Sequence, residues 1–291
     1  MSEYPDRRKG LTLAVMAAMS LAFITTFAKL TYQNGSTPLT LITFRALTGV
    51  IVLLILARLF EGPLKIERKA IPSLLMSGLG LGMITFGYMS SVAYIPVGLA
   101  ALIFYLFPLI LLVYEAIHDR RRPGIRRITA FAMAFVGLAL ALGPSMENLD
   151  IRGVAFAFFG GLGSVVFFIG GQKASNSLGP LGIGAISNVM ILPIAAAVMF
   201  AFDAYALPDT DIGWSALLLA CLAYLLGVSF QLGAVRFAKP SEAGLIHNIE
   251  PVVSIAIAWF VLNEVLSPIQ LVGVALVILS ISYGSRLASH S

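Results

Sequence analysis

Charged side chains are scarce in this chain of 291 residues, where Asp, Glu, Lys and Arg together make up 11% of the sequence. Soluble domains carry about 25%, and a water-soluble protein of this length could not cover its surface with so few charges. Hydrophobic residues make up 59%, and long apolar runs recur from end to end, which places nearly the whole chain in a bilayer. A soluble enzyme, a disordered protein and a secreted disulfide scaffold are therefore excluded.

Cysteine and histidine are also scarce. Cys221 is the single cysteine and lies inside an apolar run, and the three histidines (His118, His247 and His290) are scattered along the chain. Neither a disulfide framework nor a metal cluster can be built from them alone. The sequence also has no ATP-binding G-x-x-x-x-G-K-[S/T] loop and no nucleophile elbow with a histidine partner. We therefore expect no metal, no cofactor, no catalytic residues and no enzymatic activity.

The apolar runs predict an all-α polytopic membrane protein with ten transmembrane helices. A helix needs about 20 mostly apolar residues to cross the hydrocarbon core, and breaks of charge, Pro and Gly divide the chain into segments of that length. The predicted spans are 10–33, 39–60, 70–93, 97–118, 125–143, 151–175, 181–202, 213–236, 240–262 and 267–286. The first run is too long for the apolar core of a signal peptide, so we expect it to be retained.

The positions of Lys and Arg predict the orientation. With the N-terminus inside, nearly all of them fall in inner segments; Arg152 alone lies outside, and Lys29 and Arg45 lie within spans. This bias follows the positive-inside rule and predicts that both termini are cytoplasmic. The net charge of +5 then reflects topology in the lipid bilayer, and nucleic acid is not an expected partner. The short loops favour a bacterial cytoplasmic (inner) membrane.

The sequence resembles itself at an offset of 143 residues, where Gly10 meets Gly153 and Pro108 meets Pro251. Each half holds five predicted spans, an odd number, so the second half must enter the membrane from the opposite side. We therefore predict two domains, residues 1–146 and 147–291, that form an inverted five-plus-five repeat. Repeats of this kind are common in secondary transporters, where exchange of conformation between the halves alternates access to a central site.

Three short segments carry a resemblance to a known family. They are Thr43-Phe44-Arg45-Ala46-Leu47, Ala243-Gly244-Leu245-Ile246 followed by Pro251, and Asn263-Glu264. With the predicted spans and the duplication, they make the chain similar over its full length to EamA-type members of the drug/metabolite transporter (DMT) superfamily. The resemblance implies export of small metabolites, amino acids prominent among them, with the aromatic amino-acid exporters as the first subgroup to consider. The chain departs from the family at residues 119–122, where many members carry a Gly-Glu pair.

Glu250 is the sharpest functional candidate. A charge near the bilayer centre costs roughly 2.5–3.5 kcal/mol on insertion scales, so an ionisable group there is a functional candidate by default. Glu250 lies in the middle of the ninth predicted span, beside Pro251, and could bind a substrate ammonium group or a proton. His247 shares its helical face, and Asn248 follows. Glu250 and His247 are candidates for proton coupling; a structural carboxylate and a buried neutral histidine are the alternatives.

Arg45 is the cation placed most deeply in a predicted span. A guanidinium is suited to bind a carboxylate or a phosphate, and an interhelical structural pair is the alternative. Lys29 lies near the outer end of the first span, from which it can reach the membrane surface. Glu115 lies one turn from the cytoplasmic Arg cluster and is interpreted as a snorkelling interface residue.

The repeat also predicts a substrate cavity with one aromatic wall and one polar wall. Such a cavity suits a solute with an apolar body and a charged head, such as an amino acid. The facing residues are Phe104, Tyr105 and Phe107 of the fourth span and His247, Asn248 and Glu250 of the ninth, with Tyr88, Phe168, Tyr224 and Gln231 as further lining candidates.

Glycine and proline positions indicate packing and hinges. Close backbone approach between helices is expected at Gly78 and Gly82 of the third span and at Gly160 and Gly163 of the sixth. Pro108 and Pro251 loosen the hydrogen-bond ladder in the middle of the fourth and ninth spans.

The leading hypothesis is a secondary-active or facilitative transporter that exports small organic metabolites, amino acids first, with protons as a candidate coupling ion. A sugar-phosphate or nucleotide-sugar exchanger is the alternative within the superfamily, but it would need several cations in the cavity. A membrane-embedded enzyme would need paired acids at one membrane face and a phosphate-binding loop. A channel would need a polar stripe along a helix. The sequence shows none of these features.

Overall fold

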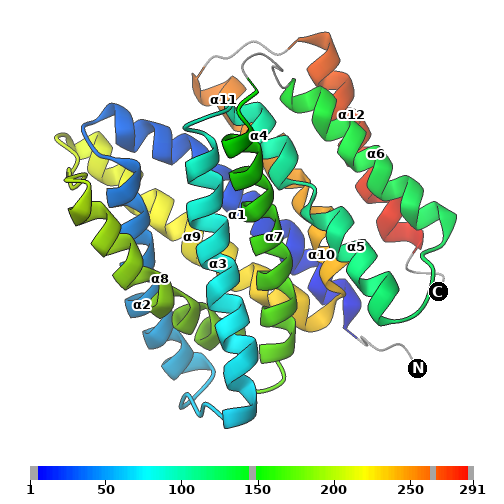
Figure 1. The fold of residues 1–291 in the computed structure, drawn as a ribbon, viewed down its shortest axis with the longest axis horizontal. Helices are drawn as coiled ribbons and strands as arrows, with labels where there is room; N and C mark the ends of the chain where they lie inside the picture. Colours follow the sequence, from blue (N-terminus) through cyan, green and yellow to red (C-terminus); the bar gives the residue numbers. More distant parts are fainter. Residues whose placement is uncertain (1–5, 144–148, 263–266, 288–291) are drawn as a thin grey trace.

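The computed structural model describes residues 6–143, 149–262 and 267–287, and all the α-helices in these ranges pack as one bundle (Figure 1). The helices are α1 (Arg7–Gln33), α2 (Pro38–Phe60), α3 (Ile71–Ser91), α4 (Val97–Phe104), α5 (Phe107–His118), α6 (Ile125–Leu142), α7 (Ile151–Ala174), α8 (Pro180–Ala201), α9 (Asp211–Phe237), α10 (Pro240–His247), α11 (Ile249–Leu262) and α12 (Pro268–Leu287), with a short 3-10 helix η1 (Arg68–Ala70) before α3.

Within the described ranges, 8 helical segments are long and apolar enough to cross a membrane, with α4 and α5 taken together as one of them. A shorter apolar helix covers Pro268–Gly284. The prediction of an all-helical membrane protein is therefore confirmed.

The fourth and ninth predicted spans are each broken in the middle, which differs from the continuous helices expected there. α4 ends at Phe104 before α5 begins, and α10 ends at His247 before α11 begins. Each of these last residues lies four positions before a proline, Pro108 or Pro251. A proline has no N–H to donate to the carbonyl four residues earlier, and its ring clashes with that carbonyl. The two prolines therefore account for both breaks.

The contacts between helices follow the sequence repeat: replacing each helix by its counterpart in the other half gives the same set of main pairs. The most extensive contacts pair α3 with α7 and α1 with α9, followed by α6 with α12 and α2 with α8. Because α1 corresponds to α7 and α3 to α9, the first two pairs are copies of one another. The other two pairs each join a helix to its own counterpart, and Figure 1 shows them on opposite sides of the bundle.

Close glycine contacts repeat in the same way. A side-chain carbon added at Gly10 would lie 2.8 Å from the backbone nitrogen of Ala238. One added at Gly153 would lie 2.7 Å from the Cγ2 atom of Ile95. Gly10 and Gly153 are related by the offset of 143 residues, and so are their contact partners Ile95 and Ala238. The start of the first helix of each half therefore packs against the same position of the other half.

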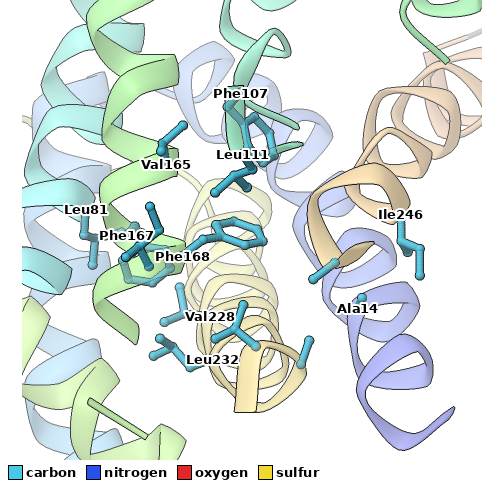
Figure 2. Close-up of a cluster of buried hydrophobic side chains, with 14 of the residues drawn as sticks. Ala14, Leu81, Phe107, Leu111, Val165, Phe167, Phe168, Val228, Leu232 and Ile246 are labelled. Atoms are coloured by element: carbon cyan, nitrogen blue, oxygen red, sulfur yellow. The ribbon is translucent and has the colours of Figure 1, made fainter. Parts of the chain in front are cut away.

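The core lies where helices of both halves meet. Figure 2 shows a buried cluster in which side chains of α5, α7 and α9 point toward one another. Its members include Phe107, Leu111, Phe167, Phe168, Val228 and Leu232.

The four glycines expected at close contacts divide into two groups. A side-chain carbon at Gly78, Gly160 or Gly163 would meet a neighbouring helix at 3.0 Å or less. At Gly82 it would meet nothing within 4 Å. Gly82 faces open space in the bundle, so it departs from the packing role predicted for it.

We expect Gly80→Ala to destabilise the protein and Gly82→Ala to leave it at least as stable. A methyl group at Gly80 would lie 2.4 Å from the backbone nitrogen of Phe167 and 2.7 Å from the carbonyl oxygen of Gly163, so α3 and α7 must move apart. Overpacking of this kind costs about 1–3 kcal/mol, whereas Ala is favoured over Gly in a helix by about 1 kcal/mol. Thermal unfolding in detergent checks both variants, and a Gly80→Ala protein with an unchanged Tm would contradict the packing argument.

Candidate functional site

A small pocket lies between α2, α3, α8 and α9. Its walls combine apolar side chains with a few polar ones, the composition typical of small-molecule sites. The lining residues are Ile42, Arg45, Ala46, Thr85, Asn188, Ile191 and Tyr224.

Arg45 is the cation of this pocket. Its guanidinium carbon lies 4.3 Å from the centre of the Tyr224 ring, a cation–π contact. The Tyr224 hydroxyl donates to Oδ1 of Asn188 at 2.7 Å, and Nδ2 of Asn188 donates to the carbonyl oxygen of Gly184 at 2.8 Å. α8 and α9 therefore fix the ring on which the guanidinium lies. The Nε atom of Arg45 is buried and has no hydrogen-bond partner.

A second polar group lies at the helix breaks. Tyr105, between α4 and α5, lies close enough to Glu250 of α11 for the two side chains to interact. Glu250 is also close enough to Arg45 and Tyr88 for its charge to interact with them. Tyr88 packs edge-on against Phe104 with ring centres 5.3 Å apart. The structure thus brings together the predicted aromatic residues of the fourth span and the carboxylate of the ninth.

His247 and Asn248 hold the broken backbone at the end of α10. Nδ1 of His247 lies 3.0 Å from the carbonyl oxygen of Ala243. Because a carbonyl only accepts, Nδ1 carries a proton. Nε2 is buried without a partner. Nδ2 of Asn248 donates to the carbonyl oxygen of Leu245 at 2.9 Å. Both side chains are buried, and neither lines the pocket described above.

Phe168 and Gln231 lie outside the pocket lining. Phe168 is buried in the core near Phe107 (Figure 2). Its ring centre lies 5.4 Å from that of Phe107 and 5.3 Å from that of His247, which are the surroundings of a packing residue. Gln231 is buried two helical turns beyond Tyr224 on the same face of α9.

Sequence reasoning missed two polar residues of the pocket, Asn188 and Thr85. Asn188 is a lone amide in the apolar span 181–202, and the cost of burying a polar group there could have marked it. The Thr85 hydroxyl donates to the carbonyl oxygen of Leu81 at 2.8 Å within its own helix. Threonines that satisfy themselves in this way are common in membrane helices, so no sequence signal distinguishes this one.

A charged cluster fixes the start of α10, and Glu115 is at its centre. Its Oε1 atom accepts from the backbone N–H of Ser241 at 2.8 Å. Its Oε2 atom accepts from the Ser241 hydroxyl at 2.5 Å and from Nη2 of Arg127 at 3.0 Å, and Arg127 also contacts the Ser241 hydroxyl. Glu115 is 7% exposed. Its interpretation as a snorkelling interface residue is wrong, because the first turn of α10 offers it buried donors.

Two further ion pairs hold the same end of α10. Arg7 of α1 donates to Glu242 at 2.9 Å, and Lys239 donates to Asp119 at 2.7 Å. The hydrogen bond from Lys239 lowers the pKa of Asp119 below its usual range, so this pair stays charged near neutral pH. Together with Glu115, these pairs tie the half-helix α10 to α1, α5 and α6.

Apolar helices able to cross a membrane, grouped around a pocket with a buried cation, are those of an integral membrane protein. The chain belongs to the EamA-like transporter family, whose sequence profile matches residues 8–143 and again residues 151–284. The resemblance noted from the sequence is therefore confirmed.

Curated relatives include amino-acid exporters. The chain is 26% identical over 218 residues to the threonine/homoserine exporter RhtA of Escherichia coli and 27% identical over 218 residues to RhtA of Salmonella typhimurium. Each alignment covers 74% of this chain and 70% of the relative. A solved crystal structure superposes with a TM-score of 0.78 over 99% of this chain and 100% of its own, at 19% identity, which shows the same fold.

We expect Glu115→Gln to lower the stability of the protein. The amide lacks the charge that Arg127 contacts, and whichever way it turns, its NH₂ group faces a donor: the Ser241 N–H, or the Ser241 hydroxyl and Arg127. An unsatisfied buried donor costs about 1–3 kcal/mol. Thermal unfolding in detergent is the measurement. Glu67→Gln is the matched control, because Glu67 pairs with Lys69 on the exposed surface, where ion pairs contribute about 0–1 kcal/mol. Equal Tm values for the two variants would contradict a structural role for Glu115.

Proposed function

We propose that the protein exports small organic metabolites, amino acids first among them, across a bacterial cytoplasmic membrane, as a secondary-active or facilitative transporter. The observation that carries the proposal is the pocket with its buried, unsatisfied Arg45 Nε, close to Glu250, inside a bundle of apolar helices. Ionisable groups in membrane segments are costly and mark substrate or ion pathways. Amino acids and the outward direction are supported by the relatives, which are named threonine/homoserine exporters.

The proposed mechanism is alternating access between two inverted halves, residues 1–146 and 147–291, with ten crossings and cytoplasmic termini. The exchange of helix contacts between the halves supports this arrangement, as do the two equivalent glycine contacts at Gly10 and Gly153. The breaks before Pro108 and Pro251 are the proposed hinges, because a helix without its ladder bonds bends at low cost. The positive-inside distribution of Lys and Arg supports the orientation.

The proposed substrate site combines the pocket and the helix breaks. Arg45 and Tyr224 contribute from α2 and α9, Glu250 and Tyr105 from the two breaks, and Tyr88 from α3. Glu250 and His247 remain the candidates for proton coupling. A sugar-phosphate or nucleotide-sugar exchanger is disfavoured, because Arg45 is the one cation among the described lining residues and Glu250 nearby would repel a phosphate.

Glu250→Gln should reduce amino-acid flux by about tenfold or more, because neutralising an intramembrane carboxylate removes the partner of an ammonium group or a proton. The measurement is counterflow into proteoliposomes with a labelled panel of amino acids, sugar phosphates, nucleosides and organic cations. Glu67→Gln is the control for a surface carboxylate and should transport normally. Normal amino-acid flux through Glu250→Gln would remove Glu250 from the site. Flux of sugar phosphates alone would replace the proposed function with the exchanger.

A pH gradient across the proteoliposome membrane should accelerate export in the wild-type protein if a proton moves in the opposite direction. Loss of the carboxylate at Glu250 should abolish this acceleration, because the amide cannot bind a proton. Flux is measured with and without the gradient at equal external pH. Wild-type flux that ignores the gradient would assign the protein to facilitated diffusion.

A further inference from the structure

Arg45 lies in the pocket without the acceptor that a buried guanidinium normally has. Its Nε atom is buried and makes no hydrogen bond. Among the described residues, no salt bridge joins it to a carboxylate. The Tyr224 ring attracts the flat face of the guanidinium. It does not accept hydrogen bonds from the N–H groups, which lie in the plane of the guanidinium. The guanidinium therefore holds at least one donor that no acceptor of the described protein satisfies.

The position of Arg45 is fixed from three helices. The Tyr224 ring beneath it is held by Asn188, and Asn188 is held by the carbonyl of Gly184. A side-chain carbon at Gly49, one turn beyond Arg45 on α2, would lie 2.5 Å from Asn188. Because residue 49 is glycine, the amide of Asn188 can pack directly against α2. This chain of contacts holds a planar five-donor fork at the wall of the pocket, the geometry that binds a carboxylate through two parallel hydrogen bonds.

Glu250 of α11 is close enough to Arg45 for the charges of the two side chains to interact. Among the described residues no ion pair joins them. The cation of the pocket therefore has an acidic group within electrostatic range that does not pair with it directly.

We infer that Arg45 is the carboxylate-binding residue of the substrate site and that Glu250 binds the ammonium group of the same solute. This assignment rests on the proposed function. It restricts the substrate class to zwitterions that carry a carboxylate and an ammonium group, as amino acids do, and makes Tyr224 and Asn188 positioning residues for Arg45. The apolar lining residues Ile42 and Ile191 then face the solute's side chain.

The test uses the full chain in proteoliposomes and the panel amino acid that gives the highest flux. Its methyl ester, which lacks the carboxylate, and its N-acetyl derivative, which lacks the ammonium group, serve as competitors. In the wild-type protein both should compete at least about tenfold more weakly than the amino acid. In Arg45→Gln the KM for the amino acid should rise about tenfold or more, and the ester should compete within about twofold of the amino acid. Discrimination against the N-acetyl derivative should persist.

Arg58→Gln is the matched control, since Arg58 is an exposed cation at the end of the same helix, and it should leave both selectivities unchanged. Tyr224→Phe keeps the ring but removes the hydroxyl held by Asn188, so the KM should rise by about threefold with discrimination against the ester retained. Selectivity against the ester that survives in Arg45→Gln would overturn the inference while leaving amino-acid export intact. An absence of amino-acid flux in the wild-type protein would instead overturn the proposed function.

A second measurement does not depend on the folding of any variant. The amino acid should raise the Tm of the wild-type protein in detergent, because a ligand that binds the native state stabilises it, and the methyl ester should not. Equal stabilisation by the amino acid and its ester would show that the carboxylate is not bound and would overturn the inference.

Discussion

Backbone hydrogen bonding in an apolar solvent is the constraint on which the rest of this structure depends. In lipid, every N–H and C=O group must find a partner within the protein. Pro108 and Pro251 have no N–H to donate, so one backbone hydrogen bond is missing in each half. The half-helices α4 and α10 end four residues before these prolines, at Phe104 and His247. The side chain of Asn248 satisfies one carbonyl near the second break. Polar side chains, Asn248 and Glu250 among them, therefore lie at the second break, and the proposed substrate site includes Glu250.

The two broken helices are held at their starts by different forces. The first turn of α10 is tied by Glu115, Arg7 and Lys239 through buried or half-buried charge pairs. At the offset of 143 residues, the corresponding start of α4 carries Pro96, Gly98 and Leu99, which are uncharged.

α4 instead begins in a small apolar cluster with α7, made of Ile95, Leu99, Ala100 and Ala157. Charge pairs are directional and need exact partners, whereas apolar contacts slide at little cost. The starts of α10 and α4 are therefore held by different kinds of contact, although the two half-helices correspond under the repeat.

Much of the fold could be predicted because its causes are local. Apolar runs of membrane length predict the helices, and the offset repeat predicts which helices correspond. The breaks in the fourth and ninth spans were missed although Pro108 and Pro251 were noted, because a single proline also fits a kinked continuous helix. Gly82 shows the limit of glycine patterns, since the sequence cannot tell which face of α3 meets α7.

The site was predictable where burial alone marks a residue. Arg45 and Glu250 stand out because ionised groups are rare in apolar spans. Asn188 carries the same signal more weakly, since an amide costs less to bury than a charge. The role of Glu115 depends on the N-terminus of α10, which lies more than 120 positions away in the sequence, so no local pattern could assign it.

The charge of the site sets a condition on what it can carry. When Glu250 is deprotonated, Arg45 and Glu250 bear opposite charges, so the proposed site is then neutral overall and a zwitterionic solute leaves it neutral. A phosphate ester would add net negative charge beside Glu250 within an apolar bundle, and the cost of an uncompensated charge in that environment is several kcal/mol. An organic cation would add positive charge beside Arg45 in the same way. A site that stays electrically neutral through the transport cycle thus favours a solute that carries both charges. This preference depends only on the charges of Arg45 and Glu250 and not on the apolar part of the solute.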